Sequence, residues 1–158
     1  MKKIEIGKKV RNFTLESTNK EDFNLKDNLE GYVVLFFYPK DNTPGCTQEG
    51  IDFSENFRKF SNQNTKIFGI SKDNLQSHNK FKEKFKFKFH LLSDVDEKIC
   101  NMFDVIKEKN MYGKKYMGIE RSTFIINKEG VLIKEWRKVK VKNHAIEVLE
   151  FIKKQNEA

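Results

Sequence analysis

The sequence predicts an α/β fold in which helices cover both faces of a central mixed β-sheet. Short apolar segments alternate with segments whose apolar residues recur at helical spacing, as in strands joined by crossover helices. Near the C-terminus, two further apolar segments flank a polar turn and add a hairpin to the sheet. Because the 158 residues contain no Pro-, Gly- or Ser-rich linker, we expect a single domain over residues 1–158.

The first predicted unit is a strand, a helix and a second strand. Residues 32–38 form an apolar run typical of a buried strand. The next segment carries Phe53, Phe57 and Phe60 at spacings of four and three residues, which predicts one helix with an aromatic stripe toward the sheet. Residues 66–70 are again strand-like, so these elements form a β-α-β unit.

The later elements follow from the same periodicities and from polar residues at their ends. They are a helix over roughly 75–85, a strand over 89–92, a short helix beginning at Asp94 or Asp96, strands over 122–126 and 131–136 around the turn 127–130, and an amphipathic helix over 143–154.

The composition describes a folded, aromatic-rich and basic protein. Fifteen Phe and a mean hydropathy of −0.72 indicate a bulky core inside a charged shell. A net charge of +8 would suit a nucleic acid as partner, and Lys80–Phe89 alternates basic and aromatic residues that can stack on bases. Alternation is also typical of a half-buried strand or its approach, and acidic residues are interleaved along most of the chain. We therefore favour a solvated face and expect no nucleic-acid partner.

The sequence favours a cytoplasmic protein without a membrane partner. Its apolar runs are too short to cross a bilayer, and Glu5, Lys8 and Lys9 interrupt any signal peptide. The two cysteines, Cys46 and Cys100, are 54 positions apart, and a reducing compartment favours free thiols. None of the three histidines lies at metal-ligand spacing with a cysteine, so we expect no metal and no other cofactor.

Cys46 stands where a helix is expected to begin. Thr43 has the chemistry of an N-cap and Pro44 suits the first helical position, so Cys46 should lie in the first turn. The positive end of the helix and its unpaired amide groups favour a thiolate there. The alternative is a small buried hydrophobe. The position at a helix start favours a reactive sulfur.

Pro39, Thr43 and Cys46 form the pattern Pro-x-x-x-Thr-x-x-Cys, and the sequence resembles the peroxiredoxins. Within that family it is similar to the bacterioferritin comigratory protein subfamily, also called peroxiredoxin Q. The similarity extends from the N-terminal segment to the last helix, and residues 36–47 and 112–124 carry most of it. The resemblance implies a thioredoxin-like fold, a monomer, and a thiol-dependent peroxidase that reduces hydrogen peroxide and alkyl hydroperoxides.

The resemblance also implies the roles of four residues. Cys46 matches the peroxidatic cysteine, and Arg121 matches an arginine that contacts both the thiolate and the peroxide. Thr43 matches a threonine that hydrogen-bonds the peroxide, and Pro39 a proline that shields the sulfur. From the residues alone, Arg121 is a charge at a strand start that would pair with Glu120. On the same basis, Thr43 is an ordinary N-cap and Pro39 a strand terminator.

One departure from the subfamily bears on the catalytic cycle. Many members carry a resolving cysteine five positions after the peroxidatic one, and here that position is Ile51. Cys100 lies among apolar residues of the expected short helix, which favours a packing role. We expect a one-Cys cycle in which thioredoxin, glutaredoxin or glutathione reduces the Cys46 sulfenic acid. The alternative is a transient Cys46–Cys100 disulfide after local unwinding of the Cys46 helix.

Two other functions compete with the peroxidase interpretation. A thiol-disulfide oxidoreductase normally uses Cys-x-x-Cys, and residues 45–49 lack the second cysteine. A basic nucleic-acid-associated protein with an incidental thiol would show salt-dependent retention on DNA and no peroxidase activity.

Overall fold

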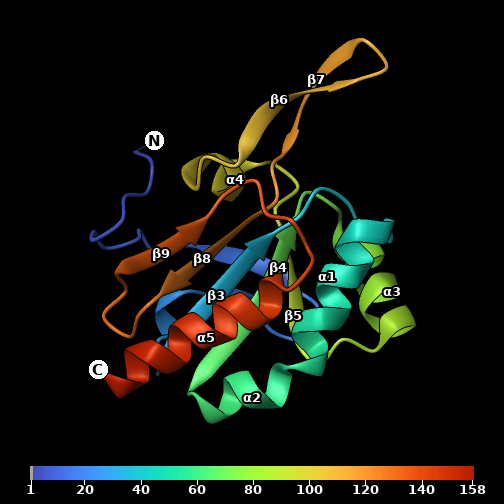
Figure 1. Cartoon of the computed structure of the whole chain (residues 1–158). Helices are drawn as coiled ribbons and strands as arrows, with labels where there is room; N and C mark the ends of the chain where they lie inside the picture. Colours follow the sequence, from blue (N-terminus) through green and yellow to red (C-terminus); the bar gives the residue numbers. More distant parts are fainter. Residues whose placement is uncertain (1) are drawn as a thin grey trace.

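The computed structural model describes residues 2–158 and has a seven-stranded mixed sheet at its centre (Figure 1). The strand order is β2-β1-β5-β4-β3-β8-β9, in which β3, β4 and β5 are parallel and the other pairs are antiparallel. The strands are β1 (Thr14–Ser17), β2 (Phe23–Asn24), β3 (Tyr32–Phe37), β4 (Thr65–Ser71), β5 (His90–Ser93), β8 (Ser122–Ile126) and β9 (Leu132–Trp136). This confirms the predicted mixed sheet, its β-α-β unit and its C-terminal hairpin.

Helices and loops cover both faces of the sheet. One face carries α1, α2, α3 and α5, whereas α4, a short 3₁₀ helix and the N-terminal segment cover the other (Figure 1). The helices are α1 (Pro44–Glu55), α2 (Phe57–Asn62), α3 (Leu75–Phe85), α4 (Lys98–Met102) and α5 (His144–Glu157), and the 3₁₀ helix is η1 (Lys26–Asn28). Within residues 2–158, no helix is long and apolar enough to span a membrane.

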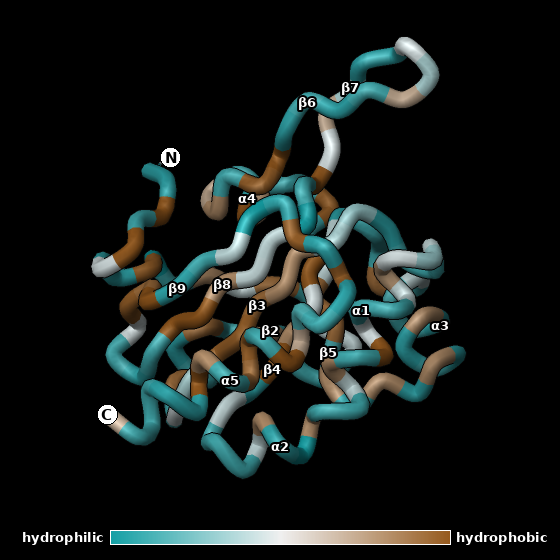
Figure 2. The backbone as a smooth tube through the Cα atoms, viewed as in Figure 1, coloured by the Kyte–Doolittle hydropathy of each residue, from teal (hydrophilic) through white to brown (hydrophobic). Residues whose placement is uncertain are grey.

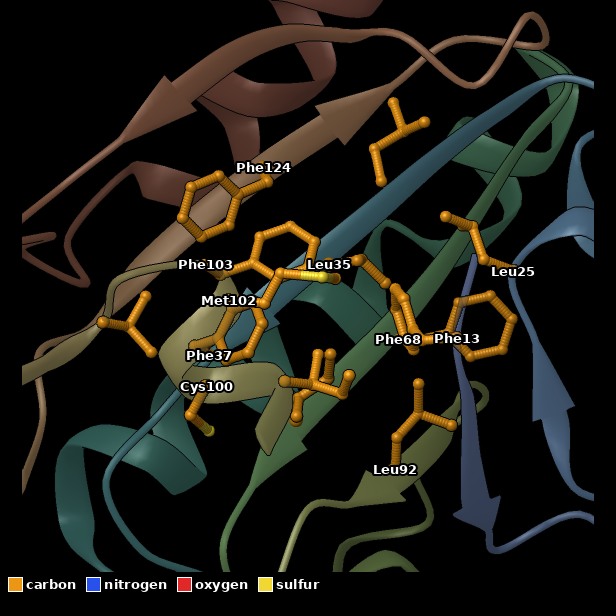
Figure 3. Close-up of a cluster of buried hydrophobic side chains, with 14 of the residues drawn as sticks. Phe13, Leu25, Leu35, Phe37, Phe68, Leu92, Cys100, Met102, Phe103 and Phe124 are labelled. Atoms are coloured by element: carbon orange, nitrogen blue, oxygen red, sulfur yellow. The ribbon is translucent and has the colours of Figure 1, made fainter. Parts of the chain in front are cut away.

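Strand β3 divides the core into two clusters because its side chains alternate between the faces. Val34 and Phe36 point to the helix-side cluster under α1, α2, α3 and α5. Leu35 and Phe37 point to the opposite cluster, which includes α4 and is called the α4-side cluster (Figure 3). The central strands are largely hydrophobic, and hydrophilic residues prevail toward the periphery of the molecule (Figure 2). The buried strand predicted over residues 32–38 therefore contributes side chains to both core clusters.

The aromatic helix expected after β3 is two helices rather than one. Helix α1 ends at Glu55 and α2 begins at Phe57, with Asn56 between them in a non-helical conformation. The Asn56 amide donates a hydrogen bond to the Asp52 carbonyl at 2.8 Å, and such side-chain bonding to the backbone competes with helix continuation. The prediction of one continuous helix is wrong, although Phe53 and Phe60 are both buried in the helix-side cluster as expected.

The basic and aromatic segment Lys80–Phe89 is half helix and half loop. Helix α3 ends at Phe85, and Lys86 takes a left-handed conformation with φ of 54° before the chain enters β5. Phe81, Phe87 and Phe89 are buried in the helix-side cluster. These three rings are therefore packing residues and are not available to stack on bases.

The short pair β1–β2 and a second, separate sheet were not predicted from the sequence. The latter is a hairpin of β6 (Ile106–Met111) and β7 (Lys114–Ile119), joined by Tyr112 and Gly113 with φ of 53° and 80°. It projects from the body of the molecule (Figure 1). Its strands are exposed and rich in lysine, so they lack the alternation that identifies a half-buried strand.

Helix α1 rests closely on an aromatic ring one turn after Cys46. A Cβ atom at Gly50 would lie 2.4 Å from the Phe87 ring, which leaves no room for a side chain at this position. The ring in turn stacks on Phe89, with centroids 5.2 Å apart. The absence of a side chain at Gly50 therefore sets how close α1 approaches the sheet.

Candidate active site

The loop from β3 to α1 places Cys46 in the first helical turn, as predicted. Pro44 is the first residue of α1 and Cys46 the third. The first backbone hydrogen bond of the helix runs from the Thr47 N–H to the Thr43 carbonyl at 2.8 Å. The amides of Gly45 and Cys46 precede this bond and point out of the helix end. Cys46 is only 2% exposed.

Arg121 reaches this sulfur from the neighbouring strand. Ser122, the first residue of β8, pairs antiparallel with Phe37, the last residue of β3, so the start of β8 lies beside the loop that leads to α1. The Arg121 guanidinium donates from Nη2 to Cys46 Sγ at 3.4 Å. A Cβ atom at residue 45 would lie 3.0 Å from Nη2, so glycine there leaves room for this approach.

The carboxylate that pairs with Arg121 is that of Glu49. Arg121 Nη1 donates to Glu49 Oε1 at 2.7 Å, and Glu49 is only 1% exposed. Pairing with Glu120, which the residues alone suggested for Arg121, is therefore wrong. Glu49 was not among the site residues predicted from the sequence. Its position three residues after Cys46 was an available signal, because residues at that spacing share a helix face.

The buried environment changes the acid–base properties of these groups. Burial raises the pKa of Glu49 to about 7, although Arg121 opposes the shift. Burial opposes the charged form of Arg121, but the negative charges of Glu49 and Cys46 outweigh it and raise the pKa of Arg121. Burial, followed by the charge of Arg121, lowers the pKa of His144 to about 4. Arg121 therefore remains a cation beside a neutral His144.

Thr43 occupies the N-cap position of α1, but its side chain does not cap the helix. The hydroxyl instead donates to the Lys40 carbonyl at 2.8 Å, within its own loop. The expected capping hydrogen bond is therefore wrong. Because the hydroxyl proton is engaged, the two lone pairs of Oγ1 remain available to accept hydrogen bonds.

Pro39 and Thr43, from the loop that leads to Cys46, line a groove on the surface. The groove has a volume of about 480 Å³, and its other wall is the β6–β7 hairpin. Its lining consists of Pro39, Lys40, Thr43, Lys72, Asp73, Lys109, Met111, Tyr116, Met117, Gly118 and Ile119. The loop that carries two of the predicted site residues therefore faces this groove.

A buried polar network anchors the same loop through Asp41. The Asp41 carboxylate accepts hydrogen bonds from the Tyr38 hydroxyl at 2.6 Å and the Ser77 hydroxyl at 2.8 Å. It also lies 2.7 Å from His78 Nδ1, and the other ring nitrogen, Nε2, lies 2.9 Å from the Leu92 carbonyl. Both nitrogens of the buried ring therefore face oxygen atoms. The network ties the loop to α3 and β5.

Asp41 and His78 also form, with Asp73, the one cluster of possible metal ligands within residues 2–158. Asp73 Oδ2 accepts the Ser71 hydroxyl at 2.6 Å and the Asp41 amide at 2.9 Å. The atoms that would bind an ion are thus already paired with protein donors. Hydrogen bonding explains the cluster without a metal.

The second cysteine lies on the other side of the sheet. Cys100 is fully buried in the α4-side cluster, whereas Cys46 belongs to the helix-side cluster (Figure 3). Burial, followed by the charge of Asp94, raises the pKa of the Cys100 thiol. Asp94 also accepts the Cys100 backbone amide at 2.7 Å. In this structure both thiols are free, and the sheet separates them.

The fold and the site define a thioredoxin-like protein that presents one thiol beside an arginine. Residues 6–135 match the AhpC/TSA family. Peroxiredoxin Bcp of Bacillus subtilis is 50% identical over 154 residues, which cover 98% of each chain.

Solved structures agree with these sequence relatives. Peroxiredoxin Q of Xanthomonas campestris superimposes with a TM-score of 0.86 at 47% identity over 90% of each chain. A PrxQ mutant from Xylella fastidiosa gives a TM-score of 0.93 at 40% identity over 99% of each chain. The chain therefore belongs to the AhpC/TSA family and, within it, to the Bcp or peroxiredoxin Q group. It is a thiol-dependent peroxidase, whose substrate is a hydroperoxide and whose electrons come from a thiol.

Replacing Glu49 by Gln should remove a pH dependence of stability. The folded pKa of Glu49, about 7, lies above the 4.5 of an unperturbed Glu, so the folded state binds more protons between these values. Raising the pH through this window therefore destabilises the fold, on the order of 3 kcal/mol for the whole shift. Urea unfolding at pH 5 and pH 8 should show that the wild type loses about 2–3 kcal/mol more than the Glu49→Gln variant. Equal losses in both proteins would contradict the assignment.

Replacing His78 by Leu should destabilise the protein strongly. The change leaves the buried Asp41 carboxyl group without one of its hydrogen-bond partners, which typically costs about 1–3 kcal/mol and more when the group left behind is charged. His90→Leu is the matched control, because His90 is only half-buried and bonds a single hydroxyl, that of Thr18, so its loss should cost about 1 kcal/mol. The free energies of unfolding from urea titration compare the two. A His78 loss no larger than the His90 loss would refute the anchoring role.

Proposed function

We propose that Cys46 is the peroxidatic cysteine of this peroxidase and that Arg121, Thr43 and Pro39 complete its active site. The hydrogen bond from Arg121 Nη2 to Cys46 Sγ at 3.4 Å supports this most directly. A guanidinium beside sulfur favours the thiolate, which is the nucleophilic form. The helix start adds the partial positive charge of its amides.

The proposed reaction is an in-line attack of the thiolate on one oxygen of the hydroperoxide. A sulfur–oxygen bond forms as the oxygen–oxygen bond breaks, which leaves Cys46 as a sulfenic acid and releases an alkoxide or hydroxide. That leaving group takes up a proton to become an alcohol or water. Charge moves from the sulfur to the departing oxygen, so donors aimed at both ends stabilise the transition state. Arg121 and the amides at the start of α1 would be these donors.

Thr43 and Pro39 would orient and shield the reacting atoms. Because the Thr43 hydroxyl donates to Lys40, its lone pairs are free to accept the proton of a bound hydroperoxide. Pro39 lies at the start of the loop and beside the groove, where an apolar ring excludes water from the sulfur. Asp41, between them, would fix both through its buried hydrogen bonds.

The substrates we propose are hydrogen peroxide and alkyl hydroperoxides. The Xanthomonas campestris bacterioferritin comigratory protein, 46% identical to this chain, is described with alkyl peroxide reduction activity.

A one-Cys cycle is the mechanism that these contacts favour. A disulfide with Cys46 would require Cys100 to leave the α4-side cluster and pass to the other side of the sheet. The position five residues after Cys46 is Ile51, which packs partly buried against the helix-side cluster. An external thiol from thioredoxin, glutaredoxin or glutathione would therefore reduce the sulfenic acid. We further propose that the protein acts in the cytoplasm as a single-domain monomer without a cofactor.

Cys46→Ser should abolish peroxide turnover, and Cys100→Ser should leave it near the wild-type rate. The first change removes the nucleophile, while the second replaces a thiol that lies in the opposite core cluster. Consumption of hydrogen peroxide with dithiothreitol as donor measures both. Wild-type activity in Cys46→Ser would reject the assignment of the nucleophile.

Peroxide-treated wild-type protein should contain a Cys46 sulfenic acid and no Cys46–Cys100 linked peptide. The sulfenic acid can be trapped with dimedone and located by mass spectrometry. The Cys100→Ser variant is the control, because its trapped yield should equal that of the wild type. A linked peptide in the wild type would replace the one-Cys cycle with the disulfide mechanism.

A further inference from the structure

We propose that the β6–β7 hairpin and its groove form the docking surface for an acidic dithiol protein that reduces the oxidised Cys46. This inference rests on the proposed one-Cys cycle and adds the surface on which the electron donor docks. Exposed apolar side chains, uncompensated positive charge and a groove shared with the loop that leads to Cys46 support it together.

The exposed apolar side chains of the molecule concentrate on this hairpin. Of the seven large exposed hydrophobic residues among residues 2–158, four lie in it: Met111, Tyr112, Tyr116 and Met117, with exposed fractions of 55, 99, 43 and 58%. The two strands pair only with each other within the described chain and project from the body (Figure 1). Apolar clusters of this kind on a soluble protein mark interaction sites.

The same hairpin carries an excess of positive charge. Residues 106–119 contain four lysines and one acidic residue, Glu108. Lys107 pairs with Asp104 at 3.3 Å and Lys115 with Glu108 at 3.8 Å. Within residues 2–158, Lys109 and Lys114 have no acidic partner. A partner with an acidic rim would supply the missing charges and be steered toward the hairpin.

The surface extends to the loop that leads to the site that the partner must reach. Met111, Tyr116 and Met117 line one wall of the groove, while Pro39 and Thr43 line the other. Strand β7 ends at Ile119, two residues before Arg121. Burial lowers the pKa of Lys109, and the positive charge of Arg121 lowers it further. Lys109 therefore lies within electrostatic range of Arg121. A partner seated on the hairpin would therefore lie next to the loop that leads to Cys46.

The chemistry of recycling explains why the partner should be a dithiol. A partner thiolate attacks the sulfur of the Cys46 sulfenic acid, forming a mixed disulfide as the sulfur–oxygen bond breaks and hydroxide leaves as water after protonation. The partner's second thiolate then attacks its own first sulfur and releases Cys46 as a thiolate. The partner ends as a disulfide, oxidised by two electrons. The surface of four apolar side chains and several lysines suits a protein better than a small thiol.

Two hairpin variants and two matched controls test the proposal. The apolar variant is Tyr112→Ser with Met117→Ser, and the charge variant is Lys114→Glu. Their controls lie elsewhere on the surface: Ile146→Ser on α5 and Lys128→Glu in the turn after β8. Each protein is assayed with an acidic thioredoxin, recycled by its reductase and NADPH, and separately with dithiothreitol. Stopped-flow oxidation of the reduced protein by hydrogen peroxide measures the first step alone.

Both hairpin variants should raise the KM for thioredoxin about tenfold, which corresponds to about 1.4 kcal/mol of binding. Turnover with dithiothreitol and the rate of Cys46 oxidation should stay within about twofold of wild type, and the controls should match wild type throughout. Added salt should raise the wild-type KM for thioredoxin but have less effect on Lys114→Glu.

Several outcomes would overturn the docking proposal. One is an unchanged KM for thioredoxin in the hairpin variants, and another is a loss of dithiothreitol-supported turnover as large as the loss with thioredoxin. A loss of activity confined to cumene hydroperoxide would make the groove a substrate site instead. A wild-type dimer that the variants dissociate would make the hairpin a contact between two copies of this chain. Failure of the proposed function is distinguishable, because wild-type Cys46 would then show no stopped-flow oxidation at all.

Discussion

The candidate site depends on one guanidinium shared between a sulfur and a buried carboxylate. Arg121 contacts Cys46 through Nη2 and Glu49 through Nη1, and both partners belong to the first turns of α1. A buried carboxylate is costly unless it is paired, and a buried cation is costly for the same reason. The Glu49 pair offsets part of the cost of holding a cation at the sulfur. It also orients the guanidinium, because two opposed hydrogen bonds fix a rigid planar group.

The sheet determines where this guanidinium can be. Antiparallel pairing of β8 with β3 places the residue before Ser122 beside the residues that follow Phe37. The end of β3 also leads into the loop that contains Pro39 and Thr43. Asp41 anchors this loop to α3 through Ser77 and His78, and His78 in turn contacts the Leu92 carbonyl of β5. Backbone pairing, and not a long flexible loop, thus brings Arg121 to a cysteine 75 positions away.

The sequence predicted the elements that have a strong period and missed those that lack one. The buried runs of β3, β4 and β8 and the helices α3 and α5 were recognisable from apolar spacing. The break at Asn56 was not, because it depends on one side-chain hydrogen bond to Asp52. The hairpin was missed because its exposed strands carry no apolar alternation.

At the site, family resemblance indicated Cys46 and Arg121, and the structure brings the two together. Only the three-dimensional structure shows that Glu49 pairs with Arg121 and that the Thr43 hydroxyl donates to the Lys40 carbonyl. Helix spacing put Glu49 on the same face as Cys46, but only the tertiary structure shows which cation it meets. Likewise, a threonine hydroxyl can either cap a helix or bond within its own loop, and only the local geometry shows which of the two Thr43 does.

The contact between Gly50 and Phe87 has a kinetic consequence. The ring supports α1 at close range, so melting the helix would expose Phe87 together with the apolar residues around it. A cycle that keeps α1 folded has no internal rearrangement to limit its speed. The pace of its regeneration would be governed by the encounter with the electron donor and the exchange of sulfur bonds, and not by refolding of α1.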